Sequence, residues 1–225
     1  MIEQDEHPPV NTVNVSLAGM EEARVYRTED YKNKSFTSRR RDKWLERFDR
    51  KLALEAFNLV GSDSHIVDIP CGNGRFFEIF SKARKLTLAD YSMNMLKVCE
   101  ERFGEPQNVR LIRADITSLP LLDNSADLCF CMRLFHHMRT DDVRLSALRE
   151  LARVVNKNKY VALSFYNRSC WRFLRKKILG KKISGSYITF SRMIGLAKQA
   201  GLECVKRFPR LNLVEEQCLV VFRKS

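Results

Sequence analysis

The sequence predicts an α/β protein with a doubly wound, mostly parallel, seven-stranded sheet and an antiparallel hairpin at the C-terminal edge. Three observations predict this fold. Short apolar runs alternate with amphipathic segments along the chain. A turn containing Gly72 and Gly74 directly follows one of these runs. The run 127–132 is almost continuously apolar, as expected of a strand buried on both faces.

The N-terminal half is predicted to form helix, strand, helix and strand in that order. An apolar stripe through Trp44, Phe48 and Leu52 predicts the first helix, and a Gly-Ser-Asp turn at 61–63 ends it. The helix that follows the glycine turn begins at Gly74 in this prediction. The expected elements are helix 38–59, strand 65–69, helix 74–81 and strand 85–89.

The C-terminal half continues the alternation and then changes to strands. Ser92 stands where a helix N-cap is expected, and Gly104 ends that helix. Gly201 closes the last helix, and two strands follow it. The expected elements are helix 92–104, strand 109–113, strand 127–132, helix 141–155, strand 160–165, helix 189–200, and strands 203–208 and 217–223.

Length and composition indicate a single domain. A chain of 225 residues with 44% apolar and 30% charged residues can bury one sizeable core. We expect an N-terminal tail or flap at 1–37, a cofactor-binding domain at 38–225, and a basic insertion at 167–187. No apolar run is long enough to span a membrane, and the acidic N-terminus is unlike a signal peptide, so we expect a cytoplasmic protein. The seven cysteines lack CxxC spacing and are expected to be reduced, without a zinc site.

The net charge of +13 is concentrated in two segments. Lys32–Lys51 holds nine bases against three acids, and Arg168–Lys182 holds seven bases and no acid. Such segments beside a cofactor domain suggest an anionic partner: a phosphate group, RNA or an acidic membrane surface. A solvated face of a basic protein explains the same charges about equally well.

Polar residues follow four of the predicted parallel strands. Because the carboxyl ends of parallel strands meet at one edge of a sheet, we expect a ligand site there. A dinucleotide-binding enzyme would need a third glycine three residues after Gly74, and Phe77 stands in that place. The residues at the four strand ends are Asp68 with the glycine turn, Asp90, Asp115 and the loop Arg133–His137.

These motifs together resemble one family of enzymes. The chain contains D-x-x-C-G-N-G-R-F, A-D-Y-S-x-x-M-L, A-D-I-T-S-L-P, R-L-F-H-H and R-E-L-A-R-V, in that order. This order resembles the class I S-adenosylmethionine-dependent methyltransferases, in the small single-domain branch of ubiquinone and menaquinone methylases (methyltransferase type 11), which have a Rossmann-like fold. The resemblance covers roughly Val60 to Phe165.

The resemblance implies S-adenosyl-L-methionine as cofactor and a role for each motif residue. The turn after the first strand would line the methionine part, Asp90 would bind the ribose hydroxyls, and Asp115 would accept from the adenine amino group. Ile116 would flank the adenine ring, and the backbone carbonyl of Arg133 would face the cofactor's ammonium group. Pro70 departs from the family, which usually has glycine there. The implied cofactor-binding residues are Asp68, Pro70, Cys71, Gly72, Gly74, Asp90, Tyr91, Asp115, Ile116 and Arg133.

His136 and His137 are the candidate catalytic residues. A histidine could remove a proton from the acceptor as its nucleophile forms. Packing or positioning of the cofactor is the alternative, and the resemblance favours it. Metal ligands with suitable spacing are missing from the sequence, so no metal is expected.

The insertion 167–187 carries a predicted amphipathic helix. Trp171, Leu174 and Ile178 fall on one of its faces, and most of its bases fall on the other. The helix could lie on an acidic membrane or a phosphate-rich substrate. It could instead be a lid whose apolar face covers the active site. Tyr26, Tyr31, Phe36 and residues 39–41 are candidates for an N-terminal flap over the cofactor.

The sequence leaves three functions open. The first is methyl transfer to a small-molecule or lipid-like acceptor. The second is RNA methylation, because the glycine turn and the His-His loop also resemble tRNA wobble-uridine ester methylases and the basic segments could bind phosphates. The third is a non-catalytic cofactor-binding subunit of a partner enzyme. DNA is not expected as substrate, because an Asp/Asn-Pro-Pro-Tyr loop is missing after the fourth strand.

Overall fold

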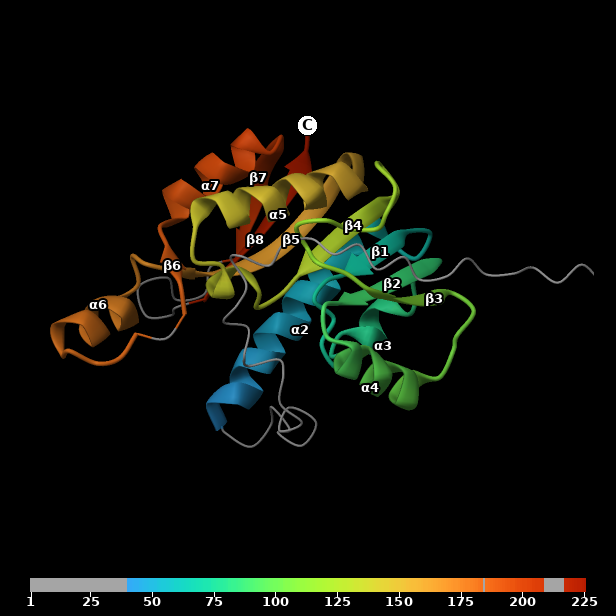
Figure 1. Ribbon diagram of the computed structural model, residues 1–225, viewed down its shortest axis with the longest axis horizontal. Coiled ribbons are helices and arrows are strands. Elements are labelled where there is room, and N and C mark those ends of the chain that lie inside the picture. Colours follow the sequence, from blue (N-terminus) through green and yellow to red (C-terminus); the bar gives the residue numbers. More distant parts are fainter. Residues whose placement is uncertain (1–39, 184, 209–216) are drawn as a thin grey trace, which may run out of the picture.

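The fold is organised around one mixed β-sheet. The computed structural model describes residues 40–183, 185–208 and 217–225. The predicted tail or flap, with Tyr26, Tyr31 and Phe36, lies outside these residues. The sheet has the strand order β3-β2-β1-β4-β5-β8-β7, and β6 pairs with β5 beside this path. Pairing is parallel from β3 to β5 and antiparallel at β5–β8 and β8–β7, which confirms the predicted fold class (Figure 1).

Most strands lie where the sequence predicts them. The fifth strand is longer than expected, because Val155 pairs with Ala126 across a register shift before the regular ladder begins. Strand β6 was not predicted; it has two residues and no alternating pattern to reveal it. The strands are β1 His65–Asp68, β2 Lys85–Asp90, β3 Val109–Arg113, β4 Ala126–Cys131, β5 Val155–Asn167, β6 Tyr187–Ile188, β7 Leu202–Phe208 and β8 Gln217–Lys224.

The helices also follow the prediction, with one exception. The helix expected at 74–81 begins only at Phe77, because Gly74 has a φ of 72° and therefore belongs to the turn. A short 3₁₀ helix, η2, was not predicted. The helices are α2 Arg40–Val60, α3 Phe77–Phe80, α4 Met93–Phe103, η2 Phe135–His137, α5 Asp141–Val154, α6 Trp171–Ile178 and α7 Phe190–Gln199.

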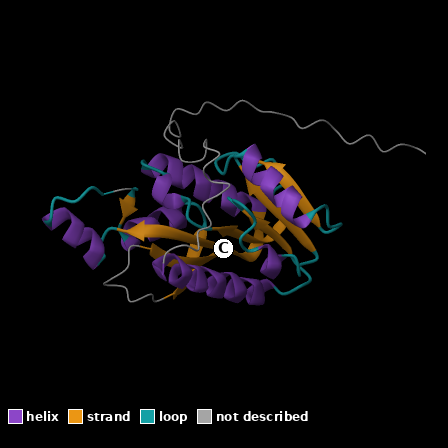
Figure 2. Cartoon of the chain, turned by 90° about the horizontal axis from the view of Figure 1, so that it is seen from below, coloured by secondary structure: helices purple, strands orange, loops and turns teal. Residues whose placement is uncertain are grey.

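Helices cover both faces of the sheet (Figure 2). On one face, α5 and α7 pack over a core that includes Val67, Leu151 and Leu163. On the other, α2, α3 and α4 pack over a core that includes Ile66 and Phe80. Ile66 and Val67 are neighbours in β1 and point to opposite faces, as the alternation of side chains along a strand requires.

Helix α6 lies apart from both layers, at one end of the molecule (Figure 1). It connects through β6 to β5, and so to the carboxyl end of the sheet. Among the described helices, α6 included, none combines the length and the apolar character that crossing a bilayer requires.

Candidate functional site

The carboxyl ends of β1, β2, β3 and β4 lie side by side and carry the predicted site residues. The chain crosses from β1 outward to β2 and β3, then returns to β4 on the other side of β1. Strand order therefore reverses between β1 and β4, and such a point is where ligands bind in open α/β sheets. Backbone hydrogen bonds join the loops beyond these ends: Ile69 N donates to Phe130 O at 2.9 Å, and Cys71 N to Ala89 O at 2.8 Å.

Asp68 is the most unusual residue at this edge. Its side chain is fully buried, and neither carboxylate oxygen has a hydrogen-bond partner within the described residues. Burial is the main reason that the pKa of Asp68 lies well above its usual value. Buried polar groups are nearly always paired, and leaving one unpaired costs stability. The position therefore suits a ligand that brings its own donor or positive charge.

The glycine turn next to Asp68 needs both of its glycines, for different reasons. Gly72 and Gly74 both have positive φ, 54° and 72°. A Cβ on Gly72 would meet no atom of the described residues within 4 Å, so with respect to them this side of the turn is open to a ligand. A Cβ on Gly74 would clash with the ring of Phe103, so Gly74 makes room for helix α4. Pro70 follows a cis peptide bond and does not need a positive φ.

Asp90, at the end of β2, is held by backbone donors. Its Oδ2 accepts from Gly72 N and its Oδ1 from Ser92 N, both at 2.9 Å. Burial raises the pKa of Asp90 despite these bonds. The carboxylate thus lies in a fixed orientation beside the glycine turn, and each oxygen keeps a lone pair for a further donor. Cys71 and Cys99 are buried behind this turn, and Cys99 Sγ lies 3.2 Å from Gly72 O.

The residues after β3 extend the same edge. Asp115 Oδ1 accepts from both the backbone N and the hydroxyl of Thr117 at 2.8 Å, which fixes its carboxylate in a turn. Ile116 is buried beside it. Tyr91 is 41% exposed, and the guanidinium of Arg113 lies 5.4 Å from the centre of its ring.

A buried acid that the sequence analysis missed ties the N-terminal helix to this edge. Asp49 of α2 is fully buried and accepts from Arg75 Nη2 at 2.7 Å and from Arg133 Nη2 at 2.6 Å. Arg133 has a φ of 59°, and its backbone N donates to Ser164 Oγ at 2.8 Å. The prediction used only the backbone of Arg133, whereas its side chain links the loop after β4 to α2. Asp49 lies on the buried face of α2 beside Leu52, so an acid inside an apolar stripe was the available signal.

His136 is buried, stacks on the ring of Tyr166 and has the tilted ring of His137 beside it. Its ring lies 4.1 Å from that of Tyr166, nearly parallel to it, and 4.1 Å from that of His137. Burial lowers the pKa of His136 to about 3, with smaller contributions from His137 and Arg133. The imidazole is therefore neutral at physiological pH, and its low basicity favours positioning over proton removal. Within the ranges described above, no group of three or more His, Cys, Asp or Glu side chains is placed to hold a metal ion.

Residues 67–163 match the protein-family model described as "Methyltransferase domain", and this range runs from within β1 to within β5 and includes every strand-end residue above. This match agrees with the resemblance of the chain's motifs to the class I S-adenosylmethionine-dependent methyltransferases. S-adenosylmethionine is the cofactor that such a domain implies. Asp68 is buried without a partner among the described residues, one side of Gly72 is open, and the Asp90 carboxylate is fixed in orientation. These three features fit a ligand that carries an ammonium group and a ribose diol.

Relatives of this chain act on different substrates. It is 30% identical over 120 residues to the mouse tRNA (carboxymethyluridine(34)-5-O)-methyltransferase, covering 53% of this chain and 16% of that protein. It is 34% identical over 100 residues to the demethylmenaquinone methyltransferase of Staphylococcus aureus, covering 43% of this chain and 40% of that protein. The chain thus spans well under half of these relatives.

Solved structures share the fold. The magnesium protoporphyrin IX methyltransferase of Synechocystis with bound S-adenosylhomocysteine has a TM-score of 0.67 at 13% identity, and the alignment covers 82% of this chain and 85% of that one. At this identity the likeness concerns the fold alone.

Proposed function

We propose that this protein transfers the methyl group of S-adenosylmethionine to a small-molecule or lipid-like acceptor. The observation that carries the proposal is the carboxyl edge of the sheet, where the buried Asp68 has no partner in the part of the chain that the structure describes and lies beside the open side of Gly72. A polar group left unpaired at a cost in stability is expected where a ligand completes the site.

Each residue of this edge has a proposed role toward the cofactor. Asp68 and the turn at Gly72 would bind the methionine part, with Asp68 opposite a positive charge. Asp90, fixed by two backbone N–H groups, would accept from the ribose hydroxyls. Asp115 and Ile116 would hold the adenine by a hydrogen bond and by packing. The cofactor supplies an already activated methyl group, so the protein's own task is to align the acceptor and exclude water.

The surroundings of His136 favour an apolar acceptor. Its neutral ring stacks on Tyr166, and the ring of Tyr187 lies 5.3 Å from that of Tyr166. These aromatic side chains offer flat apolar surface next to the loop after β4. Burial lowers the pKa of both histidines of this loop, that of His136 to about 3, and their neutral imidazoles suit positioning of the acceptor.

RNA methylation is the second candidate. The mouse relative is named as a tRNA methyltransferase, and the basic segments of this chain could bind phosphates. The apolar residues on the surface of the insertion are less suited to a phosphate backbone, so we rank this candidate second.

Incubation with cofactor labelled in its methyl group, in the presence of separate lipid, small-metabolite and RNA fractions, tests the proposal. We expect label in the lipid or small-metabolite fraction, and none when Asp68→Asn replaces the wild-type protein. Label in RNA alone would replace the first candidate by the second. Tight cofactor binding with no labelled product in any fraction would support the non-catalytic subunit.

A further inference from the structure

Helix α6 exposes an apolar face. Trp171 is 54% exposed, Leu174 46% and Ile178 69%. All three lie on one side of the helix, as the sequence predicts, because they are separated by three and four residues. Leu179 and Ile183, which follow the helix in sequence, are also exposed apolar residues. Exposed apolar side chains that gather in one place indicate an interaction site.

The opposite side of α6 is the one that contacts the rest of the protein. The ring of Phe173 lies 4.7 Å from that of Tyr187, and Lys176 Nζ lies 3.5 Å from Tyr187 Oη. At 3.6 residues per turn, Phe173 points about 130° away from the centre of the apolar face. The apolar face is therefore turned outward in this structure, and the predicted lid, which would direct it toward the active site, does not describe this arrangement.

Basic residues surround the apolar face. Arg168–Lys182 contains seven bases and no acid. Arg175, Lys177, Lys181 and Lys182 are exposed. An outward apolar face bordered by lysine and arginine is complementary to a bilayer with anionic headgroups, where the apolar side chains enter the interface and the bases contact phosphates. An RNA partner would use the bases but would leave the aliphatic side chains exposed.

The same segment is continuous with the proposed active site. Ser186 N, just before β6, donates to the backbone O of His136 at 2.7 Å. Aromatic rings continue from Phe173 through Tyr187 and Tyr166 to His136. We infer that α6 and the residues up to Ile183 form a docking surface for an anionic membrane, which brings the acceptor side of the site to the bilayer. The lipid-like nature of the acceptor rests on the proposed function; the docking surface does not.

Sedimentation with lipid vesicles tests this surface on the full chain. We expect binding to phosphatidylcholine vesicles that contain about one third phosphatidylglycerol, little binding to pure phosphatidylcholine, and weaker binding at high salt. The double substitution Trp171→Glu with Ile178→Glu should reduce the binding at least tenfold. Lys181→Glu with Lys182→Glu should reduce it at least about 25-fold, since each lysine contributes roughly a factor of five near an anionic surface.

Matched controls change similar residues elsewhere on the surface. Leu122→Glu replaces a leucine that is 80% exposed, and Lys82→Glu with Lys97→Glu reverses two exposed charges near α3 and α4. These variants should bind vesicles as the wild type does. Circular dichroism and affinity for S-adenosylhomocysteine should be unchanged in the α6 variants, which shows that they fold.

Two results would overturn the docking surface. The first is equal vesicle binding by the α6 variants and the wild type. The second is no binding to anionic vesicles together with binding of tRNA that the same substitutions reduce. Vesicle binding is measured without methyl transfer. Failure of the proposed activity would therefore leave this result standing, and failure of vesicle binding would leave the proposed activity standing.

Discussion

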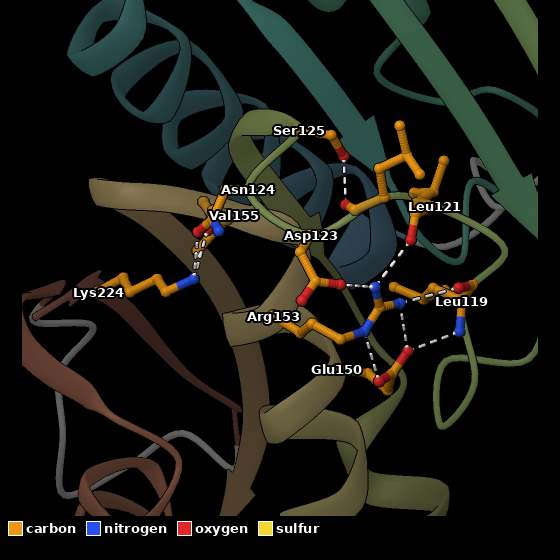
Figure 3. Close-up of polar contacts among 10 residues, drawn as sticks. Leu119, Leu121, Asp123, Asn124, Ser125, Glu150, Arg153, Val155 and Lys224 are labelled. Carbon is orange, nitrogen blue, oxygen red and sulfur yellow. Dashed lines mark hydrogen bonds and ion pairs between the residues drawn. The ribbon is translucent and has the colours of Figure 1, made fainter.

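Arg153 and Asp68 lie at opposite ends of the parallel strands and differ in how their polar atoms are paired. At the amino end, Arg153 directs its three nitrogens to five hydrogen-bond acceptors (Figure 3). At the carboxyl end, Asp68 is fully buried and has no partner in the described part of the chain. The hydrogen bonds of Arg153 stabilise the fold, whereas burial of the unpaired Asp68 carboxylate costs stability, as we expect where a ligand completes the proposed site.

The Arg153 cluster also holds the loop that leaves the site. Arg153 donates to the backbone O atoms of Leu119 and Leu121 at 2.9 and 2.8 Å, and Glu150 accepts from Leu119 N at 2.8 Å. This loop follows Asp115 and ends at β4. The Arg153 cluster thus anchors the loop that begins at Asp115, on the carboxyl edge of the sheet.

The largest effects are expected from Asp68→Asn, which should change cofactor affinity and stability in opposite directions. It should weaken binding of S-adenosylmethionine by about 3 kcal/mol, because a charged partner for the ligand is lost. It should also stabilise the cofactor-free protein, because no charge then has to be buried. Calorimetry and denaturant unfolding measure the two effects. A loss of stability together with unchanged affinity would contradict the role of Asp68.

Arg153→Met is expected to do the reverse of Asp68→Asn, because it should mainly lower stability and hardly affect cofactor binding. It should lower the free energy of unfolding by about 2 kcal/mol, because two backbone carbonyls and two carboxylates lose their donor. Cofactor affinity should change far less than in Asp68→Asn. Arg84→Met is the control, since its pair with Asp63 is exposed and should contribute less than about 0.5 kcal/mol. Equal losses in the two arginine variants would contradict the cluster's role.

The smallest expected effect concerns how stability depends on pH. As pH rises, ionisation of Asp68 should lower the free energy of unfolding, whereas ionisation of Glu150 should raise it. The pKa of Asp68 is raised by burial, so its ionisation destabilises the cofactor-free protein as pH rises above about 4. The gain from Asp68→Asn should therefore grow with rising pH. The pKa of Glu150 is lowered, chiefly by its hydrogen bond from Arg153, so its contribution is present above about pH 4.5 and is lost as pH falls through its folded value.

Denaturant unfolding of the variants Asp68→Asn and Glu150→Gln between about pH 4 and pH 7 measures this difference. The stability gained by Asp68→Asn and the stability lost by Glu150→Gln should both become smaller as the pH falls. Parallel pH profiles for the two variants would show that the ends do not differ in this way.

The sequence predicted the sheet and the strand-end carboxylates well. Apolar runs such as 127–132 and carboxylates directly after them are local patterns, and parallel strands bring their ends together without further information. The glycine turn was also visible, but the packing of Gly74 against Phe103 was not, because it depends on where α4 lies.

Long-range features escaped the prediction. The contacts of Asp49 with Arg75 and Arg133 join residues 26 and 84 positions apart, and no local pattern encodes such pairing. For α6 the amphipathic pattern identified the apolar face, but its direction depends on the contact between Phe173 and Tyr187. The roles proposed for the individual site residues stay predictions until cofactor binding is measured.

Titration of S-adenosylhomocysteine into the wild type and Asp90→Ala, followed by calorimetry, tests the central claim most directly. The wild type should bind, and Asp90→Ala should bind more weakly by about 1–3 kcal/mol, because charged hydrogen bonds to the ribose are lost. Asp63→Ala, at an exposed carboxylate far from the site, should bind as the wild type does. A wild type without affinity for this molecule, or equal affinity in Asp90→Ala, would contradict the claim that the carboxyl edge holds the cofactor.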